Sequence, residues 1–278
     1  MLDRAGLLQL KSSVTHVEEA RHFDHPSVVR GPPCENCPSR DRGMCCQINR
    51  EEFEWLFPNG VHFQTHEAGA ALFHQGEPFD HVLLIRSGWV LTYKVFQDGQ
   101  RQIIRFALPG DLIGFEGDEA SGMAYSAEAI SDVALCGVKR SVFYKACASS
   151  PHLAMNFVTA LTREALSAWN HVGALGQQTA LGRVANLLLD LHRRVAAQCE
   201  TDGPGVHLPI NQIHIADATG LTPVHVCRTL KQMRLEGLLE FHKGRLILID
   251  PNRLAEIAQL DPEVRLDRPS PVSPLAVA

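Results

Sequence analysis

A chain of 278 residues with 45% hydrophobic side chains is long enough to bury the cores of two modest domains. It contains no apolar run near the roughly 20 residues that a membrane helix needs, and its N-terminus carries charges where a signal peptide is apolar, so we expect a cytoplasmic protein with no membrane partner. The net charge of −5 excludes a strongly basic chain, and any affinity for nucleic acid must come from local placement of charge.

Residues 1–50 are predicted to form an N-terminal arm that carries a cysteine loop. Cys34, Cys37, Cys45 and Cys46 fall within thirteen residues of a chain with eight cysteines. A disulfide framework is not expected in the cytoplasm, whereas a C-x2-C pair places two thiolates where they can share one metal centre. The spacing leaves three interpretations open: tetrahedral zinc, an iron–sulfur cluster and a redox dithiol.

Residues 51–150 are predicted to form a β-roll sensor domain. The segment EEFEWLF indicates a short amphipathic helix. From about residue 61 to residue 146, short apolar alternations such as HVLLIRSGWVLTYKVF and RQIIRFAL are separated by Gly, Pro and Asp turn signals. This pattern favours an antiparallel β-roll or barrel.

A long helix is predicted for residues 151–177, with Pro151 in its first turn. Apolar side chains alternate spacings of three and four along it, which is typical of a helix that pairs with its twin in a symmetric dimer. The alternative is a helix that packs only against its own domain. The predicted dimerisation seam comprises Val158, Leu161, Ala165, Ala168, Val172 and Leu175.

Residues 178–260 are predicted to form a winged helix-turn-helix, and the proline-rich residues 261–278 a flexible tail. In the segment QIHIADATGLTPVHVCRTLKQMRLEGLL, small Ala216 permits a close helix crossing and Gly220 supplies the left-handed turn. The following LLEFHKGRLILID indicates a two-strand wing. The alternative is a helical hairpin that serves only for packing.

The second helix of this motif is expected to lie in the major groove of double-stranded DNA. Val226 and Leu230 should face the core, while Arg228 is placed to contact guanine O6 and N7. Lys231, Arg234 and Lys243 are expected to contact phosphates. The predicted DNA-binding residues are Thr222, Val224, His225, Cys227, Arg228, Lys231, Arg234 and Lys243.

The order of arm, β-roll, long helix and winged helix resembles the CRP/FNR superfamily of bacterial transcription regulators. Within it, FALPGDLIGFEG followed by AYSAEAISDVALCGVKRSVF is similar to the oxygen-responsive FNR branch, which has an isolated cysteine at the position of Cys136. The resemblance implies an α+β fold: an N-terminal antiparallel β-roll (cupin-like, of the cyclic-nucleotide-binding type), a dimerisation helix and a C-terminal winged helix-turn-helix.

For function, the resemblance implies a homodimeric activator that binds a two-fold symmetric operator and works with RNA polymerase. It also implies a [4Fe-4S] cluster on Cys34, Cys37, Cys45 and Cys136, with Cys46 as a rival to Cys45. With the cluster intact, the loop is expected to be pinned to the β-roll and dimerisation favoured. Oxygen is expected to release the loop and to shift the protein toward monomers that bind DNA weakly. The alternative function is a regulator of the same fold with a zinc or thiol-redox site.

Two departures from the superfamily's patterns affect the expected ligands. Residues 110–129 contain no arginine and several carboxylates that would repel a phosphate, so no cyclic nucleotide is expected. FNR-type recognition helices usually carry Glu and Ser along with the Arg, whereas here Val224 and Cys227 accompany Arg228. The operator is therefore expected to differ from the usual FNR site.

A ferredoxin-like electron carrier is the remaining rival function, but the helix-turn-helix argues against it. No nucleophile lies beside a base, so we predict that the chain is not an enzyme.

Overall fold

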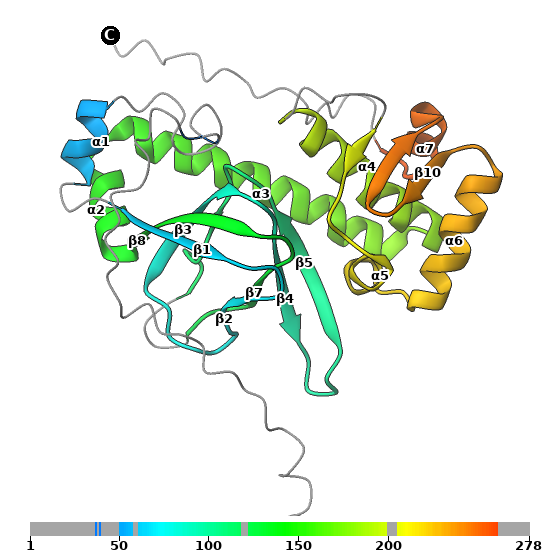
Figure 1. Ribbon diagram of the computed structural model, residues 1–278, viewed down its shortest axis with the longest axis horizontal. Helices are drawn as coiled ribbons and strands as arrows, with labels where there is room; N and C mark the ends of the chain where they lie inside the picture. The colour runs from blue at the N-terminus through cyan, green and yellow to red at the C-terminus, as the bar shows by residue number, and fades with distance from the viewer. Residues whose placement is uncertain are drawn as a thin grey trace, which may run out of the picture.

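The computed structural model describes residues 37, 39, 50–57, 61–117, 122–198 and 205–260. It confirms the predicted fold class, with an antiparallel β-roll, a long helix and a winged helix-turn-helix in that order (Figure 1). No helix in the described ranges is long and apolar enough to cross a membrane. The strands of the roll are β1 His62–His66, β2 Ala71–Phe73, β3 His81–Ser87, β4 Val90–Val95, β5 Arg101–Ala107, β6 Leu112–Ile113, β7 Ser126–Ala129 and β8 Val133–Lys139.

The eight strands form two four-stranded antiparallel sheets, ordered β1-β8-β3-β6 and β2-β7-β4-β5. Because side chains alternate across a strand, β8 serves two cores. Val133 and Leu135 point into the roll, whereas Val138 and Cys136 belong to a cluster on the outer face of the first sheet. At the turn into β4, Gly88 has φ +81° and lies so close to the Asp132 carbonyl that no side chain would fit.

Three helices pack beside the roll: α1 Arg50–Leu56, α2 Arg140–Ser149 and α3 Pro151–Gln177. α1 and α2 contribute apolar side chains to the cluster on the outer face of the first sheet. The Ser150 side chain caps α3 by accepting a hydrogen bond from the Leu153 amide. α3 then runs from α1 and α2 to the C-terminal unit (Figure 1). It has the bounds expected from the sequence.

The C-terminal unit begins with α4 Ala180–Ala196, which presents a leucine-rich face to the core. The remaining elements are β9 Val206–His207, α5 Gln212–Thr219, α6 Pro223–Leu235, β10 Leu239–His242, β11 Arg245–Leu248 and α7 Pro251–Ile257. The three strands form an antiparallel sheet ordered β10-β11-β9, beside the helical pair of the DNA-binding motif.

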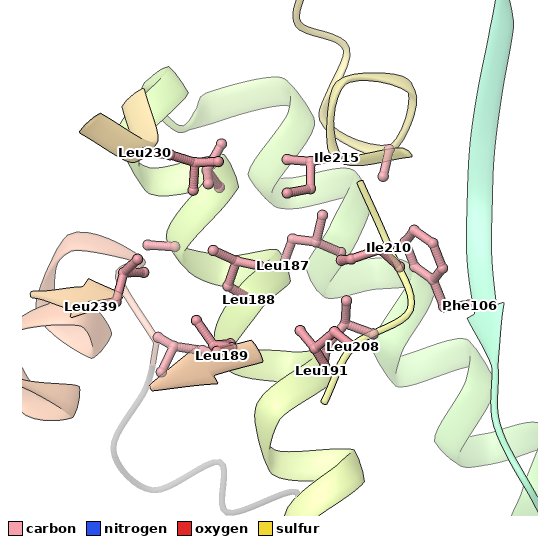
Figure 2. Packing of buried hydrophobic residues seen from close by; sticks show 14 of the residues in the cluster. Phe106, Leu187, Leu188, Leu189, Leu191, Leu208, Ile210, Ile215, Leu230 and Leu239 are labelled. Carbon is pink, nitrogen blue, oxygen red and sulfur yellow. The ribbon is translucent and has the colours of Figure 1, made fainter. Parts of the chain in front are cut away.

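One hydrophobic cluster joins the β-roll to the C-terminal unit. Phe106 of β5 packs in the same cluster as Leu208 and Ile210 and the leucines of α4 (Figure 2). The β-roll also contributes the buried side chains of Trp89 and Leu91 to this cluster. The two units therefore share a core within one chain, which the sequence did not predict.

Polar contacts reinforce this junction. Arg101 Nε donates to Asp217 Oδ2 of α5 at 2.8 Å, and Arg194 Nη2 of α4 donates to Asp111 Oδ2 at 2.8 Å. Asp111 is also paired with Arg105, which binds Glu164 of α3. Burial would lower the pKa of Arg105, but the two carboxylates raise it above its usual value. The network ties roll, long helix and α4 together.

Candidate functional site

The turn between α5 and α6 has the local geometry that a helix-turn-helix needs. Gly220 adopts φ +64°, and its amide donates to the Ala216 carbonyl to close α5. Thr222 Oγ1 accepts a hydrogen bond from the His225 amide at 3.2 Å, and Pro223 occupies the first position of α6. The chain thus fixes where the second helix begins.

Buried side chains fix the rotation of α6. Val226, Leu230 and Met233 face the shared core. The burial of Val226 and Leu230 was predicted from the sequence. The opposite face of the helix is therefore turned to solvent. All eight residues predicted to contact DNA are exposed: Thr222, Val224, His225, Cys227, Arg228, Lys231, Arg234 and Lys243.

The wing is a hairpin that turns at Lys243 and Gly244. Both residues have positive φ, 47° and 77°, as a two-residue type I′ turn requires. Arg234 Nη2 donates to the Phe241 carbonyl at 3.4 Å, which links the end of α6 to the first wing strand. The recognition helix and the wing consequently present Arg228, Lys231, Arg234 and Lys243 as exposed cations.

His214 lies where the first helix of the motif meets the roll. Its ring and the Asn211 side chain cap the start of α5 reciprocally. Burial lowers the pKa of His214, Arg101 lowers it further, and Asp217 opposes the shift. The lowered pKa favours the neutral ring, which is the form whose Nδ1 can accept the Asn211 amide hydrogen bond.

The predicted cluster ligands lie only partly within the described chain. Cys34 and Cys45 fall outside it, as does Cys46, while Cys37 and Cys136 are both partly buried. Within the described ranges no three His, Cys, Asp or Glu side chains gather as a metal site. Cys136 lies in β8, opposite Phe63 of β1 and Leu84 of β3.

Ser39, two residues after Cys37, is hydrogen-bonded at β3, the strand that pairs with the Cys136 strand β8. Its hydroxyl is buried and donates to the Arg86 carbonyl at 2.7 Å, with a second contact to the Ile85 carbonyl at 3.3 Å. Ile85 belongs to β3, which pairs with β8. The chain near Cys37 thus reaches the same sheet as Cys136.

Arg86 lies over the ring of Phe63, the residue that pairs with Cys136 across β1 and β8. Its guanidinium carbon lies 4.9 Å from the centre of the Phe63 ring. Because β8 lies between the strands of these two residues, the Arg86 side chain must cross β8 near Cys136. Its Nε is buried, and no hydrogen-bond partner is found for it in the described part of the chain. The face of the sheet that Cys136 shares with Phe63 therefore carries a cation.

The long helix exposes an apolar stripe that overlaps the predicted dimerisation seam only in part. Val158, Val172 and Ala168 are exposed as a dimer contact requires, but Leu161, Ala165 and Leu175 are half-buried in their own chain. The stripe also contains three residues that the sequence analysis missed. The exposed large apolar side chains of α3 are Met155, Val158, Leu166, Trp169 and Val172, with Trp169 at 68% and Val172 at 66% exposure.

The region where a nucleotide phosphate would be expected holds a buried acid and a phenol. Burial raises the pKa of Glu116, whose carboxyl is hydrogen-bonded to Tyr125. The Tyr125 hydroxyl also accepts from the Gly114 amide at 3.4 Å. The absence of a cyclic nucleotide remains a prediction from the sequence.

Comparison with known proteins agrees with this architecture. Residues 63–150 match the cyclic nucleotide-binding domain and residues 182–257 the Crp-like helix-turn-helix domain. The chain is 30% identical to the nitrogen fixation regulation protein FixK of Bradyrhizobium diazoefficiens, over 90% of this chain and 99% of that relative. It is 29% identical to the transcriptional activator protein FnrL of Cereibacter sphaeroides, over 81% and 91% of the two chains. The structure of FixK2 from Bradyrhizobium japonicum matches with a TM-score of 0.64 and 31% identity, over 71% of this chain and 96% of that one. The chain therefore belongs to the CRP/FNR family of DNA-binding transcription regulators.

Proposed function

We propose that this regulator is a cytoplasmic activator, acting with RNA polymerase, whose operator binding responds to oxygen through a [4Fe-4S] cluster on Cys34, Cys37, Cys45 and Cys136. The observation that carries the proposal is the anchoring of Ser39 on β3, next to the strand that holds Cys136. It brings the chain next to Cys37 to the sheet that holds Cys136.

The donor set and its surroundings fit such a group. Iron–sulfur clusters are held by cysteine thiolates, and their reduction potentials depend on nearby charge and solvent exposure. Cys37 and Cys136 are partly buried, and Arg86 lies over the ring of Phe63, which pairs with Cys136. When bound, the cluster would supply the reactivity toward oxygen that the proposed sensing needs.

Contacts from the cysteine loop lead to the dimerisation helix. α1 follows the loop directly, and Leu56 of α1 and Phe57 directly after it pack in one cluster with Leu153 of α3. The Ser150 hydroxyl, which caps α3, donates to Glu52 Oε1 of α1 at 2.8 Å. Pinning the loop to the sheet would therefore hold α1 and the start of α3 in place. To switch the protein between mostly monomeric and mostly dimeric, this contact must contribute about 5.5 kcal/mol across the dimer.

The proposal is tested by metal content in a matched pair of cysteine variants. Protein purified without oxygen should contain about four irons and four sulfides per chain and lose its colour and its dimer in air. Cys136→Ser should lose most of the iron. Cys147→Ser should keep it, because Cys147 is a partly buried cysteine of the same apolar cluster that is not a predicted ligand.

Two results would contradict the cluster. One is a colourless protein with stoichiometric zinc, which would favour the same fold with a zinc site. The other is a Cys136→Ser variant that retains its iron. A metal-free dimer that loses DNA binding only with thiol oxidants would favour a redox dithiol.

The exposed cations of the DNA-binding face should divide into two classes. Arg228→Ala should weaken binding to the specific operator by about 1–3 kcal/mol and relax the preference for guanine at one position. Lys243→Ala should weaken binding to all sequences. It should also reduce the slope of log K against log salt concentration by about one, as for the loss of one phosphate contact. Titrations at several salt concentrations measure both effects, with exposed Lys94 of the β-roll replaced by Ala as the control. Equal losses on specific and random DNA for Arg228→Ala would contradict its role in reading bases.

A further inference from the structure

A large apolar side chain stands at the end of α6 where bases are read. Val224 is the second residue of the helix and is 62% exposed. Its backbone is fixed because the Thr222 cap and Pro223 precede it, and buried Val226 follows. Val224 therefore projects from a rigid turn and not from a frayed end.

Val224 shares the outermost face of α6 with two cations. Val226, Leu230 and Met233 mark the buried side of the helix. Val224, Arg228 and Lys231 are spaced by four and three residues, which puts them in one row on the opposite side. α6 itself lies at the edge of the molecule away from the β-roll (Figure 1). The row is consequently free to enter a major groove with Val224 at its leading end.

The chemistry of valine limits what this position can read. Valine neither donates nor accepts a hydrogen bond, and the apolar group that bases display in the major groove is the thymine C5-methyl. Against cytosine, adenine or guanine it would cover a polar edge without satisfying it, which is costly. Apolar contact with a methyl group is favourable. The position thus discriminates by attraction to one base and by unsatisfied polar groups on the others.

We propose that Val224 reads a thymine methyl group in each operator half-site, near the guanine contacted by Arg228. The inference rests on the DNA-binding function and is independent of the cluster. It defines the operator's departure from the FNR type, since the glutamate usual at this position in that branch accepts a hydrogen bond from cytosine N4.

The test removes one methyl group from the DNA. A duplex is selected by the full-length dimer, purified without oxygen, from a pool with randomised half-sites. Each thymine of the selected half-site is then replaced by deoxyuridine, one position at a time. At the position read by Val224, loss of the methyl should weaken binding about fourfold per half-site. Val224→Ser should bind the thymine and uracil duplexes equally.

A second variant distinguishes base reading from a general loss of affinity. Val224→Glu should select cytosine in place of thymine at that position, because a carboxylate accepts from cytosine N4. Val95→Ser, at an exposed valine of β4, is the matched control and should keep the wild-type preference.

The outcomes separate the two levels of the argument. The inference is overturned if deoxyuridine has no effect at any thymine of the half-site, or if Val224→Ser keeps the same sensitivity to it. A protein that binds none of the pool overturns the DNA-binding function, and this inference with it.

Discussion

Replacing Trp169 by glutamate is expected to convert the dimer into monomers and to reduce operator binding by at least a hundredfold. Trp169 is the most exposed of the large apolar side chains on α3, and Val172 lies one turn further along. Regulators of this family act as dimers, and we expect the contact at this stripe because exposed apolar patches often mark interaction sites. A buried tryptophan at the centre of an interface typically contributes 2 kcal/mol or more, roughly 2–4. A charge at the same place would add a desolvation cost on both subunits.

DNA binding should fall because the two half-sites are then bound independently. Joining two recognition helices raises affinity through effective concentration, by roughly a hundredfold to ten thousandfold. Sedimentation of the protein at micromolar concentration measures the dimer, and titration with the operator measures binding. Phe96→Glu is the matched control because Phe96, next to β4, is 55% exposed and belongs neither to α3 nor to α1. A Trp169→Glu protein that sediments as the wild type would place the dimer contact elsewhere.

The winged helix-turn-helix could be predicted from the sequence because its signals are local. Gly220, Thr222 and Pro223 each act within one turn of the chain, and the structure gives them the expected conformations. The rotation of α6 follows from apolar spacing on a helix with a single buried face. The exposure of the predicted DNA-contacting residues is a consequence of that rotation.

The dimerisation seam stays a prediction, and its register is hard to choose because α3 has two apolar faces. One packs against its own chain and the other is open, and periodicity alone does not say which is which. Leu175 satisfied the spacing, yet its side chain lies beside Gly220 at the turn of the DNA-binding motif. Trp169 did not belong to the chosen register. Its bulk amid small and polar neighbours was the available signal.

The junction between the β-roll and the C-terminal unit could not be predicted because it depends on contacts distant in sequence. Arg101 and Asp217, or Phe106 and Ile210, are brought together only by the fold. The cysteine loop shows the same limit. Spacing suggested a metal site, but the tethering of Ser39 to β3 is a long-range contact that no local pattern reveals.

Replacing Phe106 by alanine should destabilise the whole protein by about 3–5 kcal/mol and not only the β-roll. Phe106 is 3% exposed, and its ring packs 6.5 Å from that of Trp89 (centre to centre) within the cluster that also holds Ile210 and Leu208. The cavity left behind would be lined by both units, as Figure 2 shows for its neighbours. Because the units share this core, we expect them to unfold in one transition.

Urea unfolding followed by tryptophan fluorescence and by far-UV circular dichroism tests this expectation. Trp89 lies in the shared core, while the dichroism reports mainly on the helices of the C-terminal unit and α3. The two probes should coincide in the wild type and move together to lower urea in Phe106→Ala. Phe96→Ala, at an exposed position next to β4, should change stability by less than about 0.5 kcal/mol. Separate transitions in the wild type would show that the recognition helix is not held by the β-roll. In that case a structural change in the β-roll would be transmitted to the DNA-binding helices through α3 alone.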